Sequence, residues 1–199
     1  MYKIGITGGI GSGKTTVSKI FEAMGIPVYN ADSKAKYLMT SDEELIDNIK
    51  KLLGENSYFD NGELNRKYIS DIIFNDKPLL DKMNNIVHPA VQQNFIKWSN
   101  EQTSPYVIKE AAILFESGSY KDLDFIILVT APIELRIERV CKRDNITNEK
   151  VQERINNQMP DSQKIKLSDF IIINDGKHSL INQIMEVHKQ ILKLSGQET

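Results

Sequence analysis

The chain is poor in cysteine: Cys141 is the single thiol among its 199 residues. One cysteine excludes both an intramolecular disulfide framework and a Cys-x-x-Cys metal site. No feature of the neighbouring sequence marks a base that would activate this thiol as a nucleophile. We therefore interpret Cys141 as a reduced thiol on a helix rather than as a reactive group.

Long hydrophobic runs and an excess of one charge are also missing. The apolar run Phe125–Val129 is among the longest in the chain, far short of the roughly 20 apolar residues that cross a bilayer. The first residues run directly into glycines, without the apolar core and cleavage site of a signal peptide. The formal net charge is −2, so bulk electrostatics do not attract the chain to nucleic acid or to membranes. We expect a cytoplasmic protein that binds neither, and a monomer.

One segment that the chain does contain is a glycine loop, Gly8-Gly-Ile-Gly-Ser-Gly-Lys-Thr15. Its Gly-x-x-x-x-Gly-Lys-Thr spacing fits the Walker A pattern, in which backbone N–H groups surround phosphates. An apolar strand expected at residues 3–7 precedes the loop, and apolar residues at helical spacing follow it up to Met24. The alternative is a chance glycine-rich turn, and the strand–loop–helix context favours a phosphate loop.

The polar residues of this loop suit the chemistry of phosphate binding. Lys14 can reach the β- and γ-phosphates of a nucleotide, and the Thr15 hydroxyl is a suitable ligand for Mg²⁺. The helix that begins here points the positive end of its dipole at the same anions. The residues that we predict to bind the nucleotide are Gly11, Ser12, Gly13, Lys14, Thr15 and Thr16.

Short apolar segments alternate with helical patterns along much of the chain and predict a parallel α/β sheet. Beyond the first strand, we expect strands at residues 27–30, 106–110, 125–129 and 170–173, and a final helix from Leu180 to Leu194. The expected fold is a three-layer α/β/α sandwich around five parallel strands, a single domain over residues 1–199. Such sheets bind ligands beyond the carboxyl ends of their strands.

The segment from about residue 32 to about residue 101 has a different texture. Apolar residues at helical spacing mark helices around residues 45–53, 68–73 and 79–98, and the capping stretch Thr40-Ser-Asp42 precedes the first of them. We expect the third helix to be interrupted at His88-Pro89, because proline breaks the helical hydrogen-bond ladder. Since strands resume afterwards, we interpret the segment as a helical insertion rather than a separate domain.

Two classes of phosphate-loop protein compete at this point, a regulatory GTPase and a kinase with a small acceptor. The Asn-Lys-x-Asp and Asp-x-x-Gly patterns of GTPases occur nowhere in the chain, which favours the kinase. Asp32 directly follows the second expected strand, where an acceptor hydroxyl would bind, and it could serve as the base. The residues alone equally allow Asp32 to be a helix cap, and a pure nucleotide-binding module is a further alternative.

A basic segment follows the fourth expected strand. Arg139 and Arg143 are four residues apart, so a helix presents both on one face. A lid over about residues 137–160 could close over the nucleotide, exclude water and neutralise charge on the transferred group. The alternative is a solvated helix, because Glu134 and Glu138 are interspersed among the basic residues.

Together these motifs resemble the dephospho-CoA kinase family over nearly the whole chain. The resemblance is carried by Ile4–Thr15, Val28–Asp32, Ile86–Pro89, Ile113–Glu116, Arg139–Asp144, Arg154–Gln158 and Ser168–Gly176. It implies that ATP, with Mg²⁺, is the phosphoryl donor, and that the ribose 3′-hydroxyl of dephospho-CoA is the acceptor in the last step of coenzyme A biosynthesis. The rival interpretation is a kinase for a nucleoside monophosphate or a similar small acceptor.

The resemblance also implies roles for individual residues. Asp32 would orient the acceptor hydroxyl and accept its proton, and His88 would lie in or near the acceptor site. The groups that would stabilise the transferring phosphoryl group are Lys14, Arg139 and Arg143. Asn174 and Gly176 would border the adenine of ATP.

The chain departs from the family pattern at three positions. Asn30 replaces the usual first acid before Ala-Asp, which leaves one carboxylate there. Glu110-Ala-Ala replaces the more usual Asp-x-Pro, and Glu110 can approach Mg²⁺ through water. Arg136 stands where the family often has glutamine, and its role is open. Two further residues have structural alternatives: His88 as a packed turn residue before proline, and Glu116 as a purely structural group.

Overall fold

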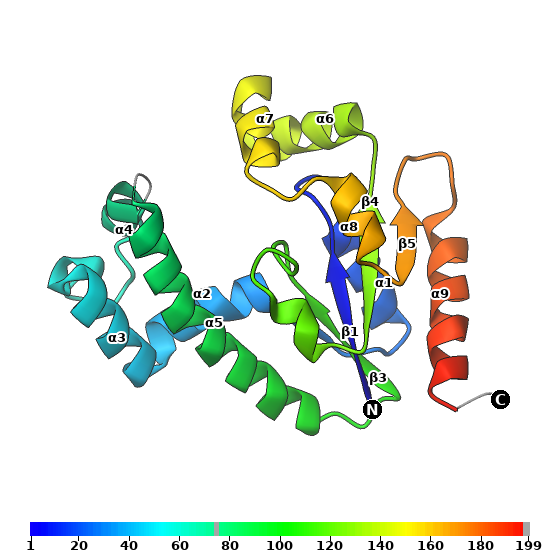
Figure 1. Ribbon diagram of the computed structural model, residues 1–199, viewed down its shortest axis with the longest axis horizontal. Coiled ribbons are helices and arrows are strands. Elements are labelled where there is room, and N and C mark those ends of the chain that lie inside the picture. Colours follow the sequence, from blue (N-terminus) through cyan, green and yellow to red (C-terminus); the bar gives the residue numbers. More distant parts are fainter. Residues whose placement is uncertain (74–75, 197–199) are drawn as a thin grey trace. The chain divides into compact units, whose positions relative to one another are not determined.

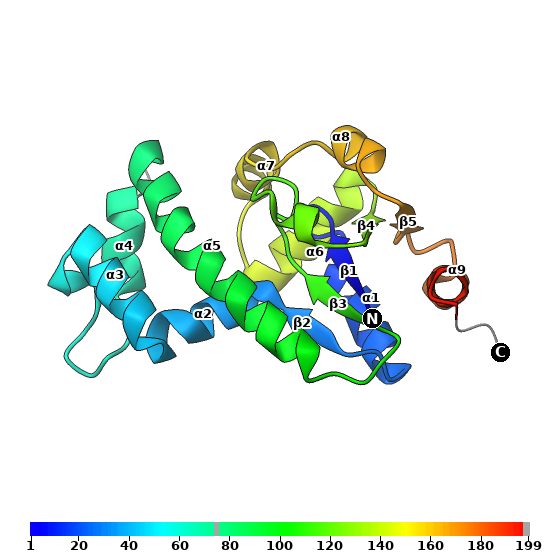
Figure 2. The same cartoon turned by 60° about the horizontal axis from the view of Figure 1, so that its bottom comes forward.

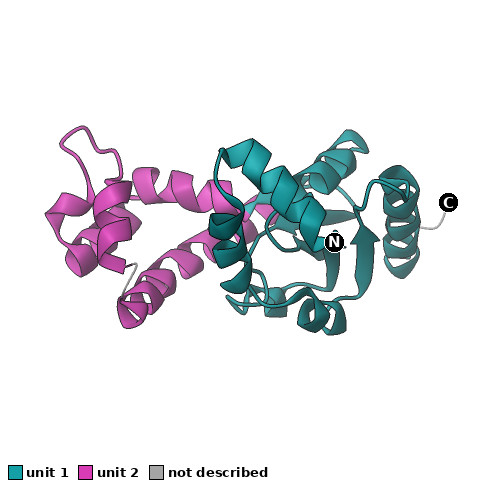
Figure 3. Cartoon of the chain, turned by 90° about the horizontal axis from the view of Figure 1, so that it is seen from above, with its two compact units in different colours: residues 1–30, 101–199 teal, residues 31–100 magenta. Residues whose placement is uncertain are grey.

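The computed structural model describes residues 1–73 and 76–196. The chain divides into two compact units, which Figure 3 distinguishes by colour. The first unit comprises Met1–Asn30 together with Glu101–Thr199, and the second is the continuous segment Ala31–Asn100. Within the described residues, no helix combines the length and the apolar character that spanning a bilayer requires.

The first unit is built on a five-stranded parallel sheet, as the sequence predicts. Its strands are β1 (Tyr2–Thr7), β2 (Val28–Asn30), β3 (Tyr106–Glu110), β4 (Phe125–Thr130) and β5 (Phe170–Ile173). They lie in the order β2-β3-β1-β4-β5, so that β1 is central (Figure 2). The inner strands are apolar along most of their length because helices and connections cover both faces of such a sheet.

Helices α1 (Lys14–Ala23) and α9 (Leu180–Leu194) pack on one face of the sheet, and α9 runs alongside β5 (Figure 1 and Figure 2). The apolar cluster between these helices and the strands includes Ile4, Ile6, Val17, Phe21, Ile127, Ile172, Ile184 and Ile191. Full burial of each such side chain stabilises the fold by roughly 1.5–3 kcal/mol. This cluster therefore holds β1 and α1, the two elements that flank the glycine loop, in fixed positions.

On the opposite face of β1, two leucine side chains pack close to the backbone because Gly5 has no side chain. A Cβ at Gly5 would lie 2.7 Å from Leu114 Cδ2 and 2.9 Å from Leu123 Cδ1. These leucines belong to the connection from β3 to β4, which contains the short helix η2 (Ser119–Asp122). The other helices of this unit are α6 (Ile133–Asp144), α7 (Asn148–Asn156) and α8 (Asp161–Lys166), of which α8 packs near β4.

The second unit is helical. Its elements are α2 (Ala31–Ser41), α3 (Glu43–Leu53), η1 (Glu55–Ser57), α4 (Arg66–Ile73) and α5 (Lys77–Asn100). Asp42 caps α3, since its Oδ1 accepts a hydrogen bond of 3.0 Å from the N–H of Leu45. The buried side chains of this unit include Leu38, Leu45, Ile49, Met83, Val87 and Phe95.

The predicted interruption at His88-Pro89 is wrong, because α5 is continuous from Lys77 to Asn100 with Pro89 inside it. Pro89 has no N–H to donate to the carbonyl of Asn85, so it removes one helical hydrogen bond. Met83, Val87, Val91 and Phe95 are nevertheless all buried along one face of the helix. Their packing maintains the helix across the proline.

Candidate active site

The phosphate loop connects β1 to α1 at the carboxyl end of β1. Gly11 and Gly13 have φ angles of 77° and 94°, in the region that favours glycine. Space is equally restrictive, because a Cβ at Gly13 would lie 2.0 Å from Nδ2 of Asn174. Gly13 is also the N-cap of α1 and supplies no side-chain hydrogen bond. The first N–H groups of the helix are therefore suited to bind an anion.

Lys14 lies over this loop. Its Nζ donates to the carbonyl oxygens of Gly8 and Gly9, at 2.8 Å and 3.4 Å. Phosphate oxygens are stronger acceptors for an ammonium group than these carbonyls, because they are charged. Two buried hydroxyls nearby, those of Thr7 and Ser12, make no hydrogen bond to any residue that the structure describes. Buried polar groups of this kind are normally satisfied, which points to a further partner at the loop.

An oxygen-rich cluster lies at the ends of β2 and β3. The buried Glu110 carboxylate accepts a 2.9 Å hydrogen bond from Thr15 Oγ1 through Oε1 and a 3.2 Å bond from Asn30 Nδ2 through Oε2. Mg²⁺ is commonly bound by one or two carboxylates together with substrate phosphates and water. In the described parts of the chain, no group of three or more His, Cys, Asp or Glu residues is placed to hold a metal. Thr15 and Glu110 together offer a hydroxyl and a carboxylate, oxygen groups of the kind that bind Mg²⁺.

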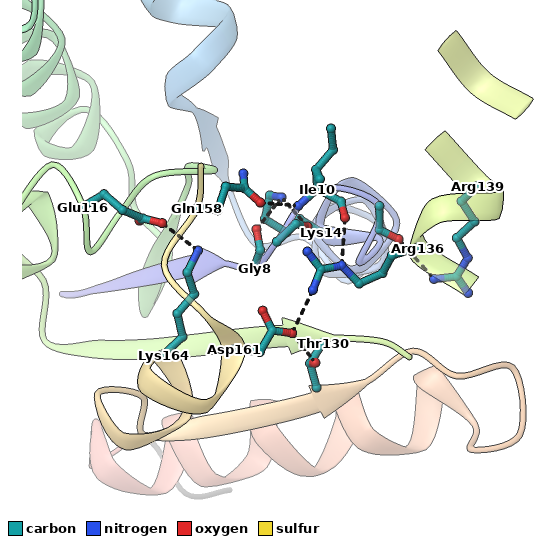
Figure 4. A network of polar contacts seen from close by, with 12 residues as sticks. Gly8, Ile10, Lys14, Glu116, Thr130, Arg136, Arg139, Gln158, Asp161 and Lys164 are labelled. Carbon is teal, nitrogen blue, oxygen red and sulfur yellow. Dashed lines mark hydrogen bonds and ion pairs between the residues drawn. The ribbon is translucent and has the colours of Figure 1, made fainter. Parts of the chain in front are cut away.

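The outer side of the phosphate loop is held by α6 and by the segment after α7 (Figure 4). Arg136 Nε donates to the carbonyl oxygen of Ile10 at 2.9 Å, and Gln158 Oε1 accepts from the Ile10 N–H at 2.8 Å. Arg136 Nη1 also forms a 3.2 Å ion pair with Asp161 Oδ2, which accepts a 2.7 Å hydrogen bond from Thr130. Arg136 is only 6% exposed, so it is a buried residue rather than part of a solvated basic surface.

Arg139 links the loop to the segment that follows β5. Its Nη2 donates to the carbonyl oxygen of Asn174 at 3.0 Å and to Asn174 Oδ1 at 3.3 Å, and its Nη1 donates to Gly11 O at 3.4 Å. Asn174 Nδ2 in turn donates to Ser12 O at 2.9 Å. Gly176 follows in a turn with a φ angle of 78°. The predicted residues Arg139, Asn174 and the glycine loop are therefore in direct contact.

Arg143, four residues further along α6, has different surroundings. It is exposed, and its Nε and Nη2 donate to the two carboxylate oxygens of Asp144 at 2.7 Å and 3.1 Å. Arg154 of α7 donates to the same carboxylate at 2.9 Å. The hydrogen bond from Arg143 lowers the pKa of the Asp144 carboxyl, and the hydrogen bond from Arg154 lowers it further by a smaller amount. The structure thus places Arg143 in an ion-pair cluster between α6 and α7.

Asp32 and His88 both belong to the second unit. Asp32 is the second residue of α2, two residues after β2 ends at Asn30. His88 lies within α5, directly before Pro89, and is half-buried. Their roles at an acceptor stay predictions.

Glu116 forms a structural contact between two connections. Its Oε1 lies 2.9 Å from Nζ of Lys164, whose side chain is fully buried, and accepts a 3.0 Å hydrogen bond from the N–H of Met159. Burial alone would raise the pKa of the Glu116 carboxyl, but Lys164 and the backbone N–H groups outweigh it and lower that pKa. This ion pair ties the connection after β3 to α8.

Sequence reasoning left the contacts of Arg136 open and assigned no role to Asp161 or Lys164. Gln158 stands in the quoted motif Arg154–Gln158, so the motif did mark its position. Asp161 follows Pro160 at the start of a short helix, a typical N-terminal signal. Nothing in the sequence indicates that Asp161 pairs with Arg136, which lies 25 positions earlier.

The chain matches a family of known proteins over most of its length. The family model for dephospho-CoA kinase matches residues 2–179. A dephospho-CoA kinase of Bacteroides fragilis is 42% identical over 186 residues, covering 93% of this chain and 90% of the relative. One of Porphyromonas gingivalis is 38% identical over 188 residues, covering 94% and 93%.

Solved structures agree with this match. A protein of Thermus thermophilus, TT1252, is 31% identical with a TM-score of 0.86 and covers 96% of this chain and 97% of that one. The dephospho-CoA kinase of Campylobacter jejuni is 26% identical with a TM-score of 0.63, covering 98% and 97%. A shikimate kinase of Acinetobacter baumannii, 14% identical with a TM-score of 0.53 over 98% of this chain and 94% of that one, shares the fold. The chain belongs to the dephospho-CoA kinase family.

Proposed function

We propose that the protein transfers the γ-phosphoryl group of ATP to the ribose 3′-hydroxyl of dephospho-CoA. The bond between the γ-phosphorus and the bridging oxygen breaks, a bond from the 3′-oxygen forms, and the hydroxyl proton is released. The products are ADP and coenzyme A. The family match supports the reaction, and the observation that carries its location is the glycine loop with Lys14 above it and Thr15 paired to Glu110.

The donor half of the site is the phosphate loop. Its backbone N–H groups, the start of α1 and the Lys14 ammonium provide positive charge and hydrogen-bond donors for the β- and γ-phosphates. The buried hydroxyls of Thr7 and Ser12, which no described residue satisfies, support a polar ligand at this place. Asn174 and Gly176, reached from the loop through Arg139, would border the adenine.

Thr15 and Glu110 would hold a magnesium ion between the protein and the phosphates. Such an ion, when bound, neutralises the charge of the β- and γ-phosphate oxygens. The hydrogen bond between Thr15 and Glu110 shows that the two side chains converge on one place. Glu110 has one methylene more than the aspartate usual in the family, and it accepts the hydrogen bond of the Thr15 hydroxyl directly.

The acceptor half belongs to Asp32 and the second unit. Asp32 would accept a hydrogen bond from the ribose 3′-hydroxyl, align its oxygen for in-line attack and take up its proton. Because Asn30 stands where the family usually has another acid, Asp32 is the carboxylate available in this element. His88 would lie near the acceptor.

The arginines of α6 would act from the lid. Arg139 already contacts the loop and Asn174, so it is suited to the nucleotide side of the site. Arg143 would have to leave Asp144 to meet a phosphate, and an anion in a closed, dry site is a stronger partner than a partly exposed carboxylate.

A single set of assays tests the acceptor. Purified protein with ATP and Mg²⁺ is expected to form ADP when dephospho-CoA is added, and not when AMP, CMP or shikimate is added. Shikimate is an informative comparison because a shikimate kinase shares the fold. Turnover with one of these three and not with dephospho-CoA would overturn the proposal. Nucleotide binding without turnover for any acceptor would favour the pure binding module.

A further inference from the structure

The peptide groups of Ile10 are held on both sides by side chains from distant parts of the chain (Figure 4). Arg136 Nε donates to the Ile10 carbonyl at 2.9 Å, and the Ile10 N–H donates to Gln158 at 2.8 Å. These contacts cross 126 and 148 residues of sequence. They lie at the outer turn of the phosphate loop, between Gly9 and Gly11.

The guanidinium of Arg136 is fitted closely against the loop. A Cβ at Gly9 would lie only 2.0 Å from Arg136 Nη2, so the arginine occupies the space that a side chain at Gly9 would need. Asp161 binds Nη1 and is itself fixed by the hydroxyl of Thr130 at the end of β4. The buried arginine is therefore oriented by a charged partner that is itself partly buried.

A bound nucleotide would affect the contacts of Lys14 and those of Arg136 differently. The Lys14 ammonium donates to two loop carbonyls, and a phosphate would replace these carbonyls as its hydrogen-bond partners. The contacts of Arg136 and Gln158 are made to the carbonyl and the N–H of Ile10, a different residue of the loop from the two whose carbonyls Lys14 contacts. They can therefore restrain a glycine-rich loop, which otherwise loses much conformational freedom when it binds a ligand.

We propose that Arg136 is a positioning residue that, together with Gln158, holds the phosphate loop in the form that receives ATP, and that Asp161 orients it. This inference rests on the proposed location of the ATP phosphates in the loop. Arg136 acts through the backbone of Ile10, not by touching the nucleotide. The affinity for the donor should depend on it, and the affinity for the acceptor should not.

The test is an Arg136→Met variant, which keeps much of the side-chain volume and removes the charge and the donors. We expect the KM for ATP and the Kd for MgADP, measured by calorimetry, to rise about tenfold, with the KM for dephospho-CoA within about twofold of the parent value. Arg136→Lys keeps the charge without the planar fork and should restore part of the ATP affinity. Lys189→Met removes an exposed cation from α9 of the same unit; it is the matched control and should change neither constant.

Two results would overturn the inference. One is a lower melting temperature with an unchanged KM for ATP, which indicates a purely structural arginine; the other is an equal rise in both KM values. If Arg136→Met does not fold, Asp161→Asn is the second variant, expected to raise the Kd for MgADP about threefold without changing the circular dichroism spectrum. An unchanged Kd in that variant also contradicts the inference.

A Lys14→Ala variant separates this inference from the proposed function. Loss of phosphoryl transfer in Lys14→Ala, with normal ATP affinity in Arg136→Met, leaves the function standing and removes the role of Arg136. Full activity in Lys14→Ala would instead mean that the ATP phosphates bind elsewhere. That result would contradict the proposed site itself, whatever the effect of Arg136→Met.

Discussion

At the scale of single residues, the sharpest prediction concerns the proton of the acceptor hydroxyl. Replacing Asp32 by asparagine keeps the size of the side chain and one accepting oxygen but removes the group that can take up a proton. For Asp32→Asn we expect kcat to fall by about 10²–10⁴, while the KM for ATP stays within about twofold. Steady-state kinetics with both substrates varied measure this.

The matched control for Asp32 is Asp47→Asn, which removes an exposed carboxylate from α3 in the same unit. We expect this variant to have parent-like kcat and KM values. Near-normal turnover in Asp32→Asn would contradict the role of Asp32 as a base and leave it only a structural role in the first turn of α2.

Substitution of Glu110 tests whether its carboxylate helps to bind Mg²⁺. Its carboxylate binds the hydroxyl of Thr15 and the amide of Asn30, so Glu110→Gln keeps both contacts possible while removing the charge that attracts a cation. We expect the Mg²⁺ concentration for half-maximal activity to rise about tenfold or more. Activity measured across a magnesium titration, at saturating ATP and dephospho-CoA, checks this.

Glu110→Asp is the informative companion, because aspartate is the usual residue of the family at this position. We expect activity to be retained with a smaller change in the magnesium requirement than in Glu110→Gln. An unchanged titration in Glu110→Gln would mean that the carboxylate serves the hydrogen bonds to Thr15 and Asn30 rather than a metal.

At the scale of secondary-structure elements, the sheet could be predicted and some helices could not. All five strands are short, mostly apolar segments, and the three inner strands β1, β3 and β4 are buried along most of their length. Helices α2 and α8 carry few buried side chains, Ala31 and Leu38 in one and Lys164 in the other. Without an apolar stripe, their sequences contain no comparable signal.

The misplaced break in α5 and the burial of Arg136 have a common cause. Both depend on contacts made across the fold, which override local preference. Pro89 weakens the helix locally, yet packing on both sides of it retains the helix. Arg136 reads as a surface cation in its own segment, and only the proximity of Asp161 and Ile10 makes its burial favourable.

The pair of Glu116 and Lys164, which joins α8 to the connection after β3, gives a prediction for pH. Although burial opposes ionisation, Lys164 and the Met159 N–H lower the pKa of the Glu116 carboxyl below its ordinary value of 4.5. The unfolded chain binds this proton more readily, so the stabilisation is full above that value and is lost as the pH falls through the folded pKa.

We therefore expect the difference in the free energy of unfolding between the parent and Glu116→Gln to shrink as the pH is lowered from about 6 to about 3. Urea denaturation at several pH values measures it. Glu63→Gln, at an exposed position in the connection between η1 and α4, is the control and should show a small, flat difference. A difference for Glu116→Gln that does not change with pH would contradict the ion-pair account.

At the scale of the whole molecule, the donor contacts are concentrated in one of the two units. The glycine loop, Glu110, Arg136, Arg139, Gln158 and Asn174 all belong to the unit formed by Met1–Asn30 and Glu101–Thr199. Asp32 and His88 belong to Ala31–Asn100. This division predicts that the two substrates order different parts of the chain.

Hydrogen exchange on the intact protein tests that division. Saturating MgADP should slow exchange at the amides of the phosphate loop, the start of α1 and the segment 158–161, because ligand binding suppresses local opening where it makes contacts. The amides of α3 and α4 should exchange at unchanged rates. Dephospho-CoA alone is expected to protect amides of α2 and α5 instead, since Asp32 and His88 lie there.

Protection by MgADP in α3 and α4 without protection of the loop would contradict the assignment of the donor to the first unit. Equal protection of the loop by both ligands would contradict the separation of donor and acceptor that the proposed reaction requires.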